Sequence, residues 1–395
     1  MTDISPQSLN PPYRVLLGPG PSNIHPRVQM AMLAPIVGHL DPYFVTFMED
    51  TMGLLRTLFR TKNELTFPIS GTGSAGMEAS FCNFLEPEDV AVIGVNGLFG
   101  ERMVDNALRC GAKVIQVSAE WGHIIEPEAI EAALKAQKRV KLLALVHAET
   151  STGILQPLTE ASQLAKQYET LFLVDTVTSL GGHEVAVDDW GIDICYSGTQ
   201  KCLSCPPGLA PFTANQRALD TLPTRTQKVH SWYLDLMLLS SYWSSSRFYH
   251  HTAPISMIYA LHEALALIAE EGLEARIQRH FRNGSALQAG LEAMGLTLHA
   301  QEGHRLKMLT SVRIPTGINE LRVRERLLNE FGIEIGGGLG PLKGQIWRIG
   351  LMGHSSSAEN VLLLLSTLEK VLIEEGYSLE PGAGVTAAIQ TLKKK

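Results

Sequence analysis

Lys201 and Asp175 are the two residues of this chain whose types and spacing point most directly to chemistry. Asp175 ends an apolar run that begins at Leu171, and Lys201 follows it by 201 − 175 = 26 positions, about one strand–crossover–strand unit. The residues around Lys201 are small or uncharged and include no carboxylate, so we expect a partly desolvated amine with a lowered pKa that can act as a nucleophile. An amine that forms Schiff bases, together with an acid that keeps a ring nitrogen protonated, is what pyridoxal phosphate requires. Taken alone, such a pair is more often a surface lysine and an aspartate that caps a helix, so the chemical interpretation depends on the other motifs.

A second candidate is the segment Ser70-Gly-Thr-Gly-Ser74, which follows a predicted strand and opens a predicted helix over residues 75–85. Free backbone N–H groups and the dipole at a helix N-terminus attract anions, and glycine allows a phosphate to approach closely. Thr72, Gly73 and Ser74 are therefore candidate phosphate ligands. The alternative is an ordinary turn with a serine N-cap.

The segment Gly94-Val-Asn-Gly-Leu-Phe-Gly100 offers a competing interpretation. It lies between two predicted strands, and Glu120 follows Gly100 by twenty positions, as the ribose-binding acid does in a dinucleotide-binding unit. Its glycines are spaced three and three, however, and not two and three as in the fingerprint. A nicotinamide-dependent oxidoreductase is thus the rival hypothesis, whereas in the pyridoxal interpretation the ring of Phe99 stacks on the cofactor.

Two further residues are candidates for ligand contacts. Thr150 lies just after a predicted strand, at the edge of the sheet where ligands bind in such folds, and its hydroxyl either contacts a cofactor or caps a helix. Arg348 lies between apolar residues in Trp347-Arg-Ile-Gly350, so it is not expected to be merely solvated. Its planar fork matches a substrate carboxylate, with a structural ion pair as the alternative.

Two other patterns are weaker. Cys202 and Cys205 have the spacing of a redox pair, but two prolines follow, and packing around Lys201 is the preferred interpretation. The adjacent His250 and His251 point to different sides of the chain, and no other spacing suggests metal ligands, so we expect no metal site. Tyr249 and Thr252 could instead offer hydroxyls to a phosphate.

The elements that must position these residues alternate between strand and helix, which predicts a large domain with a mostly parallel seven-stranded sheet. The predicted strands are 64–69, 90–94, 113–117, 141–147, 171–174, 193–196 and 209–213. A long helix over 254–282 is expected to lead to a small C-terminal α+β domain with strands 308–314 and 346–349 and helices 318–331 and 358–375. The predicted division is an N-terminal arm over 1–15, a large cofactor-binding domain over 16–282 and a small domain over 283–395.

Composition bounds the class of protein. The chain has 395 residues, 45% of them hydrophobic and 18% charged, which is typical of a globular protein with two domains. A net charge of −7 with no basic stripe argues against a nucleic-acid partner, and no apolar run is long enough for a membrane span. Five cysteines and no signal-peptide pattern predict a soluble, cytoplasmic protein.

Taken together, the motifs resemble the class V aminotransferases, which are fold-type I pyridoxal-phosphate enzymes, and among them the alanine–glyoxylate and serine–glyoxylate group. The resemblance runs from Gly18 to Gly353 and rests on segments in order: GPGPSNIHPRV, GTGSAGMEAS, NGLFGERM, HAETSTG, VDTVTSLGG, YSGTQKCLSCPPG, YHHTAPIS and WRIGLMG.

The resemblance implies a role for each candidate residue. Lys201 would carry pyridoxal phosphate as a Schiff base, and Asp175 would bond the pyridine nitrogen. Val177 and Phe99 would enclose the ring, with Thr150 at its edge, and the phosphate would lie on Thr72, Gly73, Ser74 and Gln200. Tyr249 and Thr252 would reach it from the neighbouring subunit of a homodimer, while Arg348 would bind the substrate carboxylate, with Gly38 on the substrate side.

Two departures from the family pattern concern the cofactor. Phe99 replaces a frequent tryptophan, and Ser74 stands where some relatives have histidine. Gly38-His39 agrees with a small pocket, and no second arginine has a claim to a side-chain carboxylate. We therefore expect amino transfer from a small neutral amino acid, alanine or serine, to glyoxylate, which yields glycine and a 2-oxo acid (pyruvate from alanine).

Other class V activities remain as alternatives: a cysteine desulfurase-like lyase or a 2-aminoethylphosphonate-type transaminase. A desulfurase usually has a histidine before the lysine, where this chain has Gln200, and a mobile cysteine, which the pattern does not supply. A cofactor-binding regulator would need a basic DNA-binding segment, which is also missing.

Overall fold

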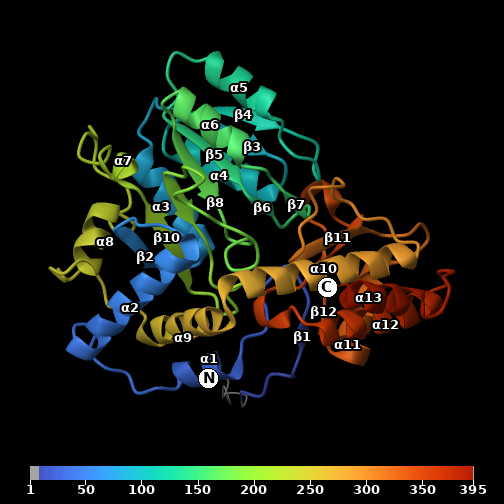
Figure 1. The fold of residues 1–395 in the computed structure, drawn as a ribbon. Coiled ribbons are helices and arrows are strands. Elements are labelled where there is room, and N and C mark those ends of the chain that lie inside the picture. The colour runs from blue at the N-terminus through green and yellow to red at the C-terminus, as the bar shows by residue number, and fades with distance from the viewer. Residues whose placement is uncertain (1–8, 395) are drawn as a thin grey trace, which may run out of the picture.

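The computed structural model describes residues 9–394 of the chain. Figure 1 shows a larger body, which holds the main sheet, and a smaller body formed mostly by the C-terminal third of the chain. The two bodies have separate hydrophobic cores: one is centred on the sheet, and the other contains Leu17, Leu287, Trp347 and Leu365.

The main sheet has seven strands in the order β2-β10-β9-β8-β5-β3-β4, which confirms the predicted number and their positions in the sequence. The strands are β2 (Leu65–Ser70), β3 (Val90–Val95), β4 (Lys113–Ser118), β5 (Leu142–Val146), β8 (Leu171–Asp175), β9 (Ile194–Tyr196) and β10 (Leu209–Ala214). β10 runs antiparallel to both of its neighbours, and the other pairs are parallel. The carboxyl ends of β2, β5, β8 and β9 therefore meet at one edge of the sheet.

The central strands are buried because helices cover the sheet. β5 and β8 are buried along their whole length, which is why their sequences are continuous apolar runs. The helices of this body are α1 (Pro26–Met32), α2 (Pro42–Phe59), α3 (Gly73–Phe84), α4 (Leu98–Arg109), α5 (Pro127–Lys135), α6 (Thr159–Gln167), α7 (Gln216–Leu219), α8 (Leu236–Trp243) and α9 (Ile255–Glu271). α3 and α4 pack together against strands of the sheet, and so do α5 and α6.

The smaller body is built on a three-stranded antiparallel sheet in the order β11-β14-β13. Its elements are α10 (Leu273–Ala293), β11 (Leu309–Arg313), α11 (Glu320–Phe331), β12 (Ile333–Glu334), β13 (Gly336–Gly337), β14 (Ile346–Gly350), α12 (Ala358–Glu374) and α13 (Ala383–Lys393), with short 3₁₀ turns at Gly340–Leu342 and Gly353–Ser355. β14 carries Arg348, so this body contributes one side of the candidate site.

The N-terminal segment joins the smaller body. β1 (Val15–Leu16) pairs in parallel with β12, and Leu17 is fully buried in the smaller core. Of the predicted arm, residues 1–8 lie outside the described residues, and residues 9–13 are exposed. The predicted domain boundary at residue 283 falls inside α10, and the division of the chain into domains stays a prediction.

The single helix expected over residues 254–282 is wrong. The chain forms α9 and α10, which are separated by Gly272. Gly272 has φ +82°, a left-handed conformation that a residue with a Cβ adopts only at a cost, and it ends α9 after Glu271. Across this break Glu271, at the end of α9, pairs with Arg276 and Arg279 of α10.

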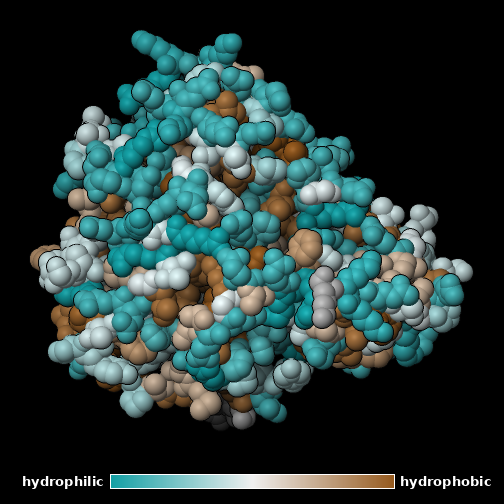
Figure 2. Space-filling model, in the orientation of Figure 1, coloured by the Kyte–Doolittle hydropathy of each residue, from teal (hydrophilic) through white to brown (hydrophobic). Residues whose placement is uncertain are grey.

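Within residues 9–394, no helix combines the length and the apolar character that a bilayer crossing requires. Figure 2 shows a surface that is mostly hydrophilic, with hydrophobic side chains exposed between the polar ones.

Candidate active site

The structure buries Lys201 without an acidic partner. The loop after β9 carries Lys201, whose side chain is 9% exposed and donates a hydrogen bond to the carbonyl oxygen of Pro19. No ion pair to Lys201 exists among residues 9–394. Burial, with a contribution from the positive charge of Arg348, lowers the pKa of Lys201 to about 8. The desolvated lysine predicted from the sequence is confirmed, and a substantial fraction of its amine is neutral near physiological pH.

The GPGP segment covers this lysine. An ideal Cβ on Gly20 would lie 2.6 Å from Lys201 Nζ, and Gly20 has φ +108°, so any larger residue there would displace the amine. The roles of Pro19 and Gly20 were missed at the sequence level. Their only signal was that GPGP begins the stretch that resembles the aminotransferases.

Asp175 is the buried carboxylate at the end of β8. It accepts hydrogen bonds from the Val177 amide and from the hydroxyl of Tyr196, each at 2.7 Å. Burial raises its pKa to about 7, although the two hydrogen bonds act in the opposite direction. A cationic ring nitrogen at this position would hold the carboxylate in its charged form. Tyr196 was another residue that sequence reasoning missed.

Asp175 and Lys201 come together because β8 and β9 are adjacent parallel strands. Asp175 lies opposite Tyr196 in the register, and Lys201 follows five positions later. The positive charge of Lys201 also acts on Asp175, lowering its pKa. The spacing argument from the sequence is thereby confirmed.

The N-terminus of α3 forms a cradle beside this pair. Thr72 is the N-cap, and its hydroxyl makes no capping hydrogen bond, which leaves it available to a ligand. Gly73 packs closely on Val177 and Gly198: an ideal Cβ on it would lie 3.1 Å from Val177 Cγ2. Next to them, the buried Oε1 atom of Gln200 has no hydrogen-bond partner. A helix of twelve residues with free N–H groups and an unpartnered amide at its start suits an anionic group such as a phosphate.

A buried carboxylate, Glu149, organises the turn that carries Phe99. Glu149 ends β6 (Ala148–Glu149), which forms a hairpin with β7 (Ile154–Leu155). It is fully buried and accepts hydrogen bonds from the Phe99 amide at 3.0 Å, the Ser151 amide at 2.9 Å and the Ser151 hydroxyl at 2.6 Å. Burial raises its pKa. Glu149 therefore links the segments of Phe99 and Thr150, and sequence reasoning gave it no role although it lies three positions after the buried strand β5.

The same carboxylate removes the support for a dinucleotide site. An ideal Cβ on Gly97 would lie 2.3 Å from Glu149 Cγ, so the glycine makes room for Glu149 and not for a pyrophosphate. Glu120, the candidate ribose acid, has a side chain 79% exposed and lies near His123.

Arg348 is buried without an acidic partner as well. Its side chain reaches across from β14, where Nε donates to the carbonyl oxygen of Gly337 at 2.7 Å and Nη1 to that of Thr150 at 3.2 Å. Its exposed fraction is 6%, and burial lowers its pKa to about 10. Within residues 9–394 it forms no ion pair, so the structural-pair alternative finds no support.

Three residues predicted to belong to the site lie on the exposed surface of the subunit. Tyr249, Thr252 and Gly38 are exposed, and within residues 9–394 none of them forms a hydrogen bond with Lys201, Asp175 or Thr72. The hydroxyl groups of Tyr249 and Thr252 lie 3.5 Å apart, and the ring of Tyr249 lies 5.2 Å from that of His39, next to Gly38. All three therefore share one exposed face.

The weaker patterns have structural explanations. Cys202 and Cys205 are buried free thiols, and burial raises the pKa of both, that of Cys202 to about 12, which does not suit redox exchange. His250 and His251 bond each other through their Nδ1 atoms at 2.8 Å, and His251 bonds Ser70. No group of potential metal ligands exists among residues 9–394.

The family follows from comparison with known proteins. The aminotransferase class-V profile matches residues 34–357. This chain belongs to the class V aminotransferases. The family is pyridoxal-phosphate dependent and has the α/β fold described above.

Relatives with named activities cover nearly the whole chain. It is 43% identical to the (S)-ureidoglycine–glyoxylate transaminase of Bacillus subtilis, over 96% of this chain and 95% of the relative. It is 38% identical to an alanine–glyoxylate aminotransferase of Drosophila melanogaster, over 91% and 93%. A crystal structure of an alanine–glyoxylate aminotransferase from Nostoc sp. is 51% identical, with a TM-score of 0.92 over 93% of this chain and 98% of that one.

The residues of the site fit the cofactor of this family. An unpaired buried amine, a buried acid on the neighbouring strand and an unpartnered glutamine at a free helix N-terminus match its aldehyde, its ring nitrogen and its phosphate.

Proposed function

We propose that this aminotransferase moves the amino group of a small neutral amino acid, alanine or serine, to glyoxylate. The products are glycine and a 2-oxo acid, which is pyruvate when alanine is the donor. The observation that carries the proposal is the pair of buried cationic groups, Lys201 and Arg348, neither of which has an acidic partner in residues 9–394. Such groups are costly to bury and are explained by ligands that complete them.

Each residue has a chemical task in this proposal. Bound pyridoxal phosphate, held on Lys201, supplies an electron sink for the charge left when the substrate loses its Cα proton. Once the amino group of the substrate has taken its place on the cofactor, the free Lys201 Nζ, whose pKa burial lowers to about 8, would take up and return that proton. Asp175 would hold the proton on the ring nitrogen, while Phe99 and Val177 would enclose the ring with Thr150 at its edge. Thr72, Gly73, Ser74 and Gln200 would bind the phosphate.

Arg348 is proposed to bind the α-carboxylate of both substrates. Two carbonyl groups orient its guanidinium, which leaves its other N–H groups for a carboxylate. Arg276, the other buried arginine of residues 9–394, is paired with Glu271 and two carbonyls. No buried arginine is thus left for a second carboxylate, which favours small neutral donors over aspartate and glutamate.

Glyoxylate as the acceptor is supported by the relatives, whose names share it. (S)-Ureidoglycine is a second candidate donor because the Bacillus subtilis relative, whose crystal structure has a TM-score of 0.96 to this chain, is named for it. A desulfurase activity receives less support. The cysteine desulfurase among the structural neighbours is only 16% identical and shows the fold alone, and all five cysteines here are buried.

We also propose that two copies of the chain form a homodimer whose sites lie at the subunit interface. Tyr249, Thr252 and Gly38 lie on one exposed face, which also carries large exposed hydrophobic side chains: Leu33, Ile36, Leu40, Tyr43 and Phe248. A second copy would cover these apolar groups and would receive the two hydroxyls at its phosphate. The five buried free thiols suit a reducing compartment, which supports a cytoplasmic location.

The experiment is an activity matrix with alanine, serine and (S)-ureidoglycine as donors, and glyoxylate and pyruvate as acceptors. Wild type is compared with Lys201→Ala and, as a control, with Lys307→Ala, since Lys307 is another partly buried lysine with a lowered pKa. Lys201→Ala is expected to lose the visible cofactor band and turnover, whereas Lys307→Ala keeps both. A Lys201→Ala enzyme with the wild-type band and rate, or a wild type inactive with glyoxylate, contradicts the proposal.

A further inference from the structure

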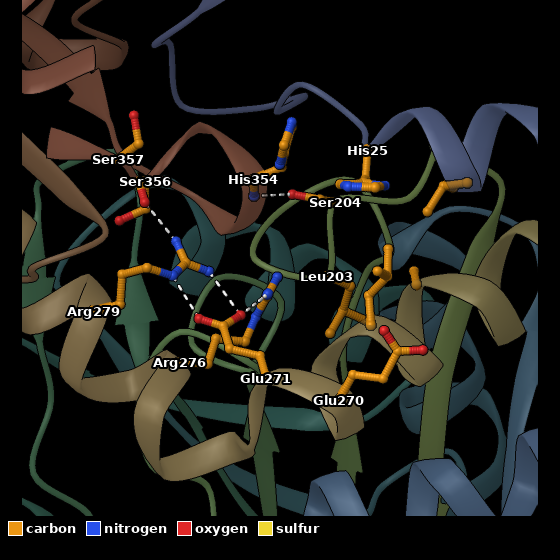
Figure 3. Close-up of a pocket in the computed structure, with 13 residues that line it drawn as sticks. His25, Leu203, Ser204, Glu270, Glu271, Arg276, Arg279, His354, Ser356 and Ser357 are labelled. Carbon is orange, nitrogen blue, oxygen red and sulfur yellow. Dashed lines mark hydrogen bonds and ion pairs between the residues drawn. The ribbon is translucent and has the colours of Figure 1, made fainter. Parts of the chain in front are cut away.

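A charged cluster lies at the junction of α9 and α10, outside the candidate active site. Glu271 ends α9, and Arg276 and Arg279 lie on the first turns of α10. The carboxylate of Glu271 bonds Arg276 Nη1 at 2.8 Å and Arg279 Nε at 2.6 Å. Figure 3 shows the three side chains converging beside a cavity of about 550 Å³, which is lined in addition by Leu203 and His354. We call these three residues the junction cluster.

Within the junction cluster, Arg276 contacts the loops that follow Lys201 and Asp175. Arg276, whose side chain is 7% exposed, donates to the carbonyl oxygen of Cys202 at 2.7 Å and to that of Gly181 at 3.1 Å. Cys202 directly follows Lys201, and Gly181 belongs to the turn after Asp175. One guanidinium thus binds both loops of the larger body that carry the chemistry.

Arg279, the other arginine of the junction cluster, contacts the loop that follows β14, the strand of Arg348. Arg279 Nη1 donates to the carbonyl oxygen of Gly353 at 3.0 Å and also to that of Ser356. The Gly353 amide donates in turn to Nε2 of His280, at 2.8 Å. The loop of residues 351–357, next to β14, is therefore attached to α10 at several points.

The two loops also contact each other directly. The amide of His354 donates to the hydroxyl oxygen of Ser204 at 2.7 Å (Figure 3), and Ser22 joins that hydroxyl to the carbonyl oxygen of Lys201. These bonds connect loop 351–357 directly to loop 202–205.

Glu271 is the residue that makes this arrangement stable. Burial works to raise its pKa, but the hydrogen bonds and charges of the two arginines hold that pKa at about 2, so the carboxylate stays ionised. Without it, two guanidinium groups would lie close together and lack a counter-charge, which is unfavourable in a half-buried place.

We propose that the junction cluster positions Lys201 and Arg348 relative to each other, by holding loop 202–205 against loop 351–357. Its three residues are positioning residues that touch neither substrate nor cofactor. The inference rests on the proposed roles of Lys201 and Arg348, since the distance between amine and guanidinium matters only if one substrate meets both. A misplacement of about 1 Å between reacting groups costs on the order of a hundredfold in rate.

The test compares Arg279→Met and Arg279→Lys with Arg282→Met. Arg282 lies on the same helix, is exposed, and makes no hydrogen bond or ion pair within residues 9–394, so it is the matched control. Arg279→Met removes the hydrogen bonds to the carbonyl oxygens of Gly353 and Ser356 and leaves the Arg276–Glu271 pair in place. We expect KM for both amino donor and oxo acid to rise about tenfold with unchanged cofactor absorption, a smaller rise in Arg279→Lys, and no change in Arg282→Met.

A second readout uses the apoprotein and requires no turnover. Hydrogen–deuterium exchange in Arg279→Met is expected to rise in peptides covering both 351–357 and 202–205, whereas a purely local role would affect only 351–357. Unchanged exchange in 202–205, or KM values equal to those of Arg282→Met, overturns the proposal. If Arg279→Met does not fold, Arg279→Lys decides by the same criteria. If wild type transfers no amino group to glyoxylate, the proposed function fails while the exchange result still decides whether the two loops are coupled.

Discussion

Replacing Arg348 by lysine tests the carboxylate-binding role, because the substitution keeps the positive charge and removes the planar fork. A guanidinium carries five N–H donors, and Arg348 uses two of them on the carbonyls of Gly337 and Thr150. These two bonds fix the plane of the group, and 5 − 2 = 3 donors are left for a substrate. A lysine has one nitrogen, so it cannot bind both carbonyls and still form two parallel bonds to a carboxylate.

The magnitude follows from the lost bond. A hydrogen bond to a charged group contributes about 1.5–3 kcal/mol, and about 1.4 kcal/mol corresponds to a tenfold change in an equilibrium constant. The expected rise in KM in Arg348→Lys is therefore about 10-fold to roughly 150-fold. It should apply to the amino donor and to glyoxylate alike, because ping-pong chemistry passes both through one site.

The assay is steady-state kinetics with both substrates varied, and the visible band of the cofactor reports its occupancy. Arg313→Lys serves as the control, because Arg313 lies on the neighbouring strand β11 and, within residues 9–394, its guanidinium hydrogen-bonds one side chain, that of Gln345. An unchanged KM, or a change confined to one substrate, would show that Arg348 does not bind the α-carboxylate.

Three further predictions concern the buried ionisable groups. Burial raises the pKa of Asp175 from 3.8 to about 7, so folding favours its protonated form, and the stability of the apoprotein should fall as the pH rises from about 4 to about 7. In Asp175→Asn the free energy of unfolding, measured with urea at each pH, should vary less over this pH range, and kcat of the holoenzyme should fall far more than KM rises. An unchanged pH dependence of the unfolding free energy would contradict the raised pKa of Asp175. The rate at which the apoprotein captures pyridoxal phosphate should rise with pH to a plateau above about 8, the pKa of Lys201. In Arg348→Met the midpoint of this rise should move to a higher pH, because the positive charge of Arg348 helps to lower the pKa of Lys201. A wild-type midpoint near 10.5, the ordinary lysine value, would argue against a desolvated amine. Glu149→Gln should weaken cofactor binding about tenfold, since an amide cannot accept all three hydrogen bonds that hold Phe99 and Ser151, and each bond contributes about 1.5–3 kcal/mol. Fluorescence titration with the cofactor checks this, and Glu120→Gln, at an exposed position, is the control variant. Equal cofactor affinities in the two variants would contradict the prediction.

The sequence alone was sufficient to predict the sheet and the placement of Asp175 and Lys201 at one edge of it. Six of the seven strands are mostly buried apolar runs bounded by polar turns, whereas β4, at the edge of the sheet, is largely exposed. Asp175 and Lys201 could be paired because their spacing places Asp175 at the end of one strand and Lys201 in the loop after the next, parallel strand, and the ends of parallel strands share one edge of a sheet. Local composition also indicated that Lys201 lacks an acidic neighbour along the chain.

Only the tertiary structure showed which distant residues complete the site. The bond between Lys201 and Pro19 spans 182 positions, and that between Arg348 and Thr150 spans 198, so neither leaves a trace in local spacing. Burial of Glu149 beneath Phe99 and the break at Gly272 depend in the same way on how strands and helices pack. Whether a buried arginine has an acidic partner is a property of its three-dimensional surroundings, and for Arg348 that property decides the functional interpretation.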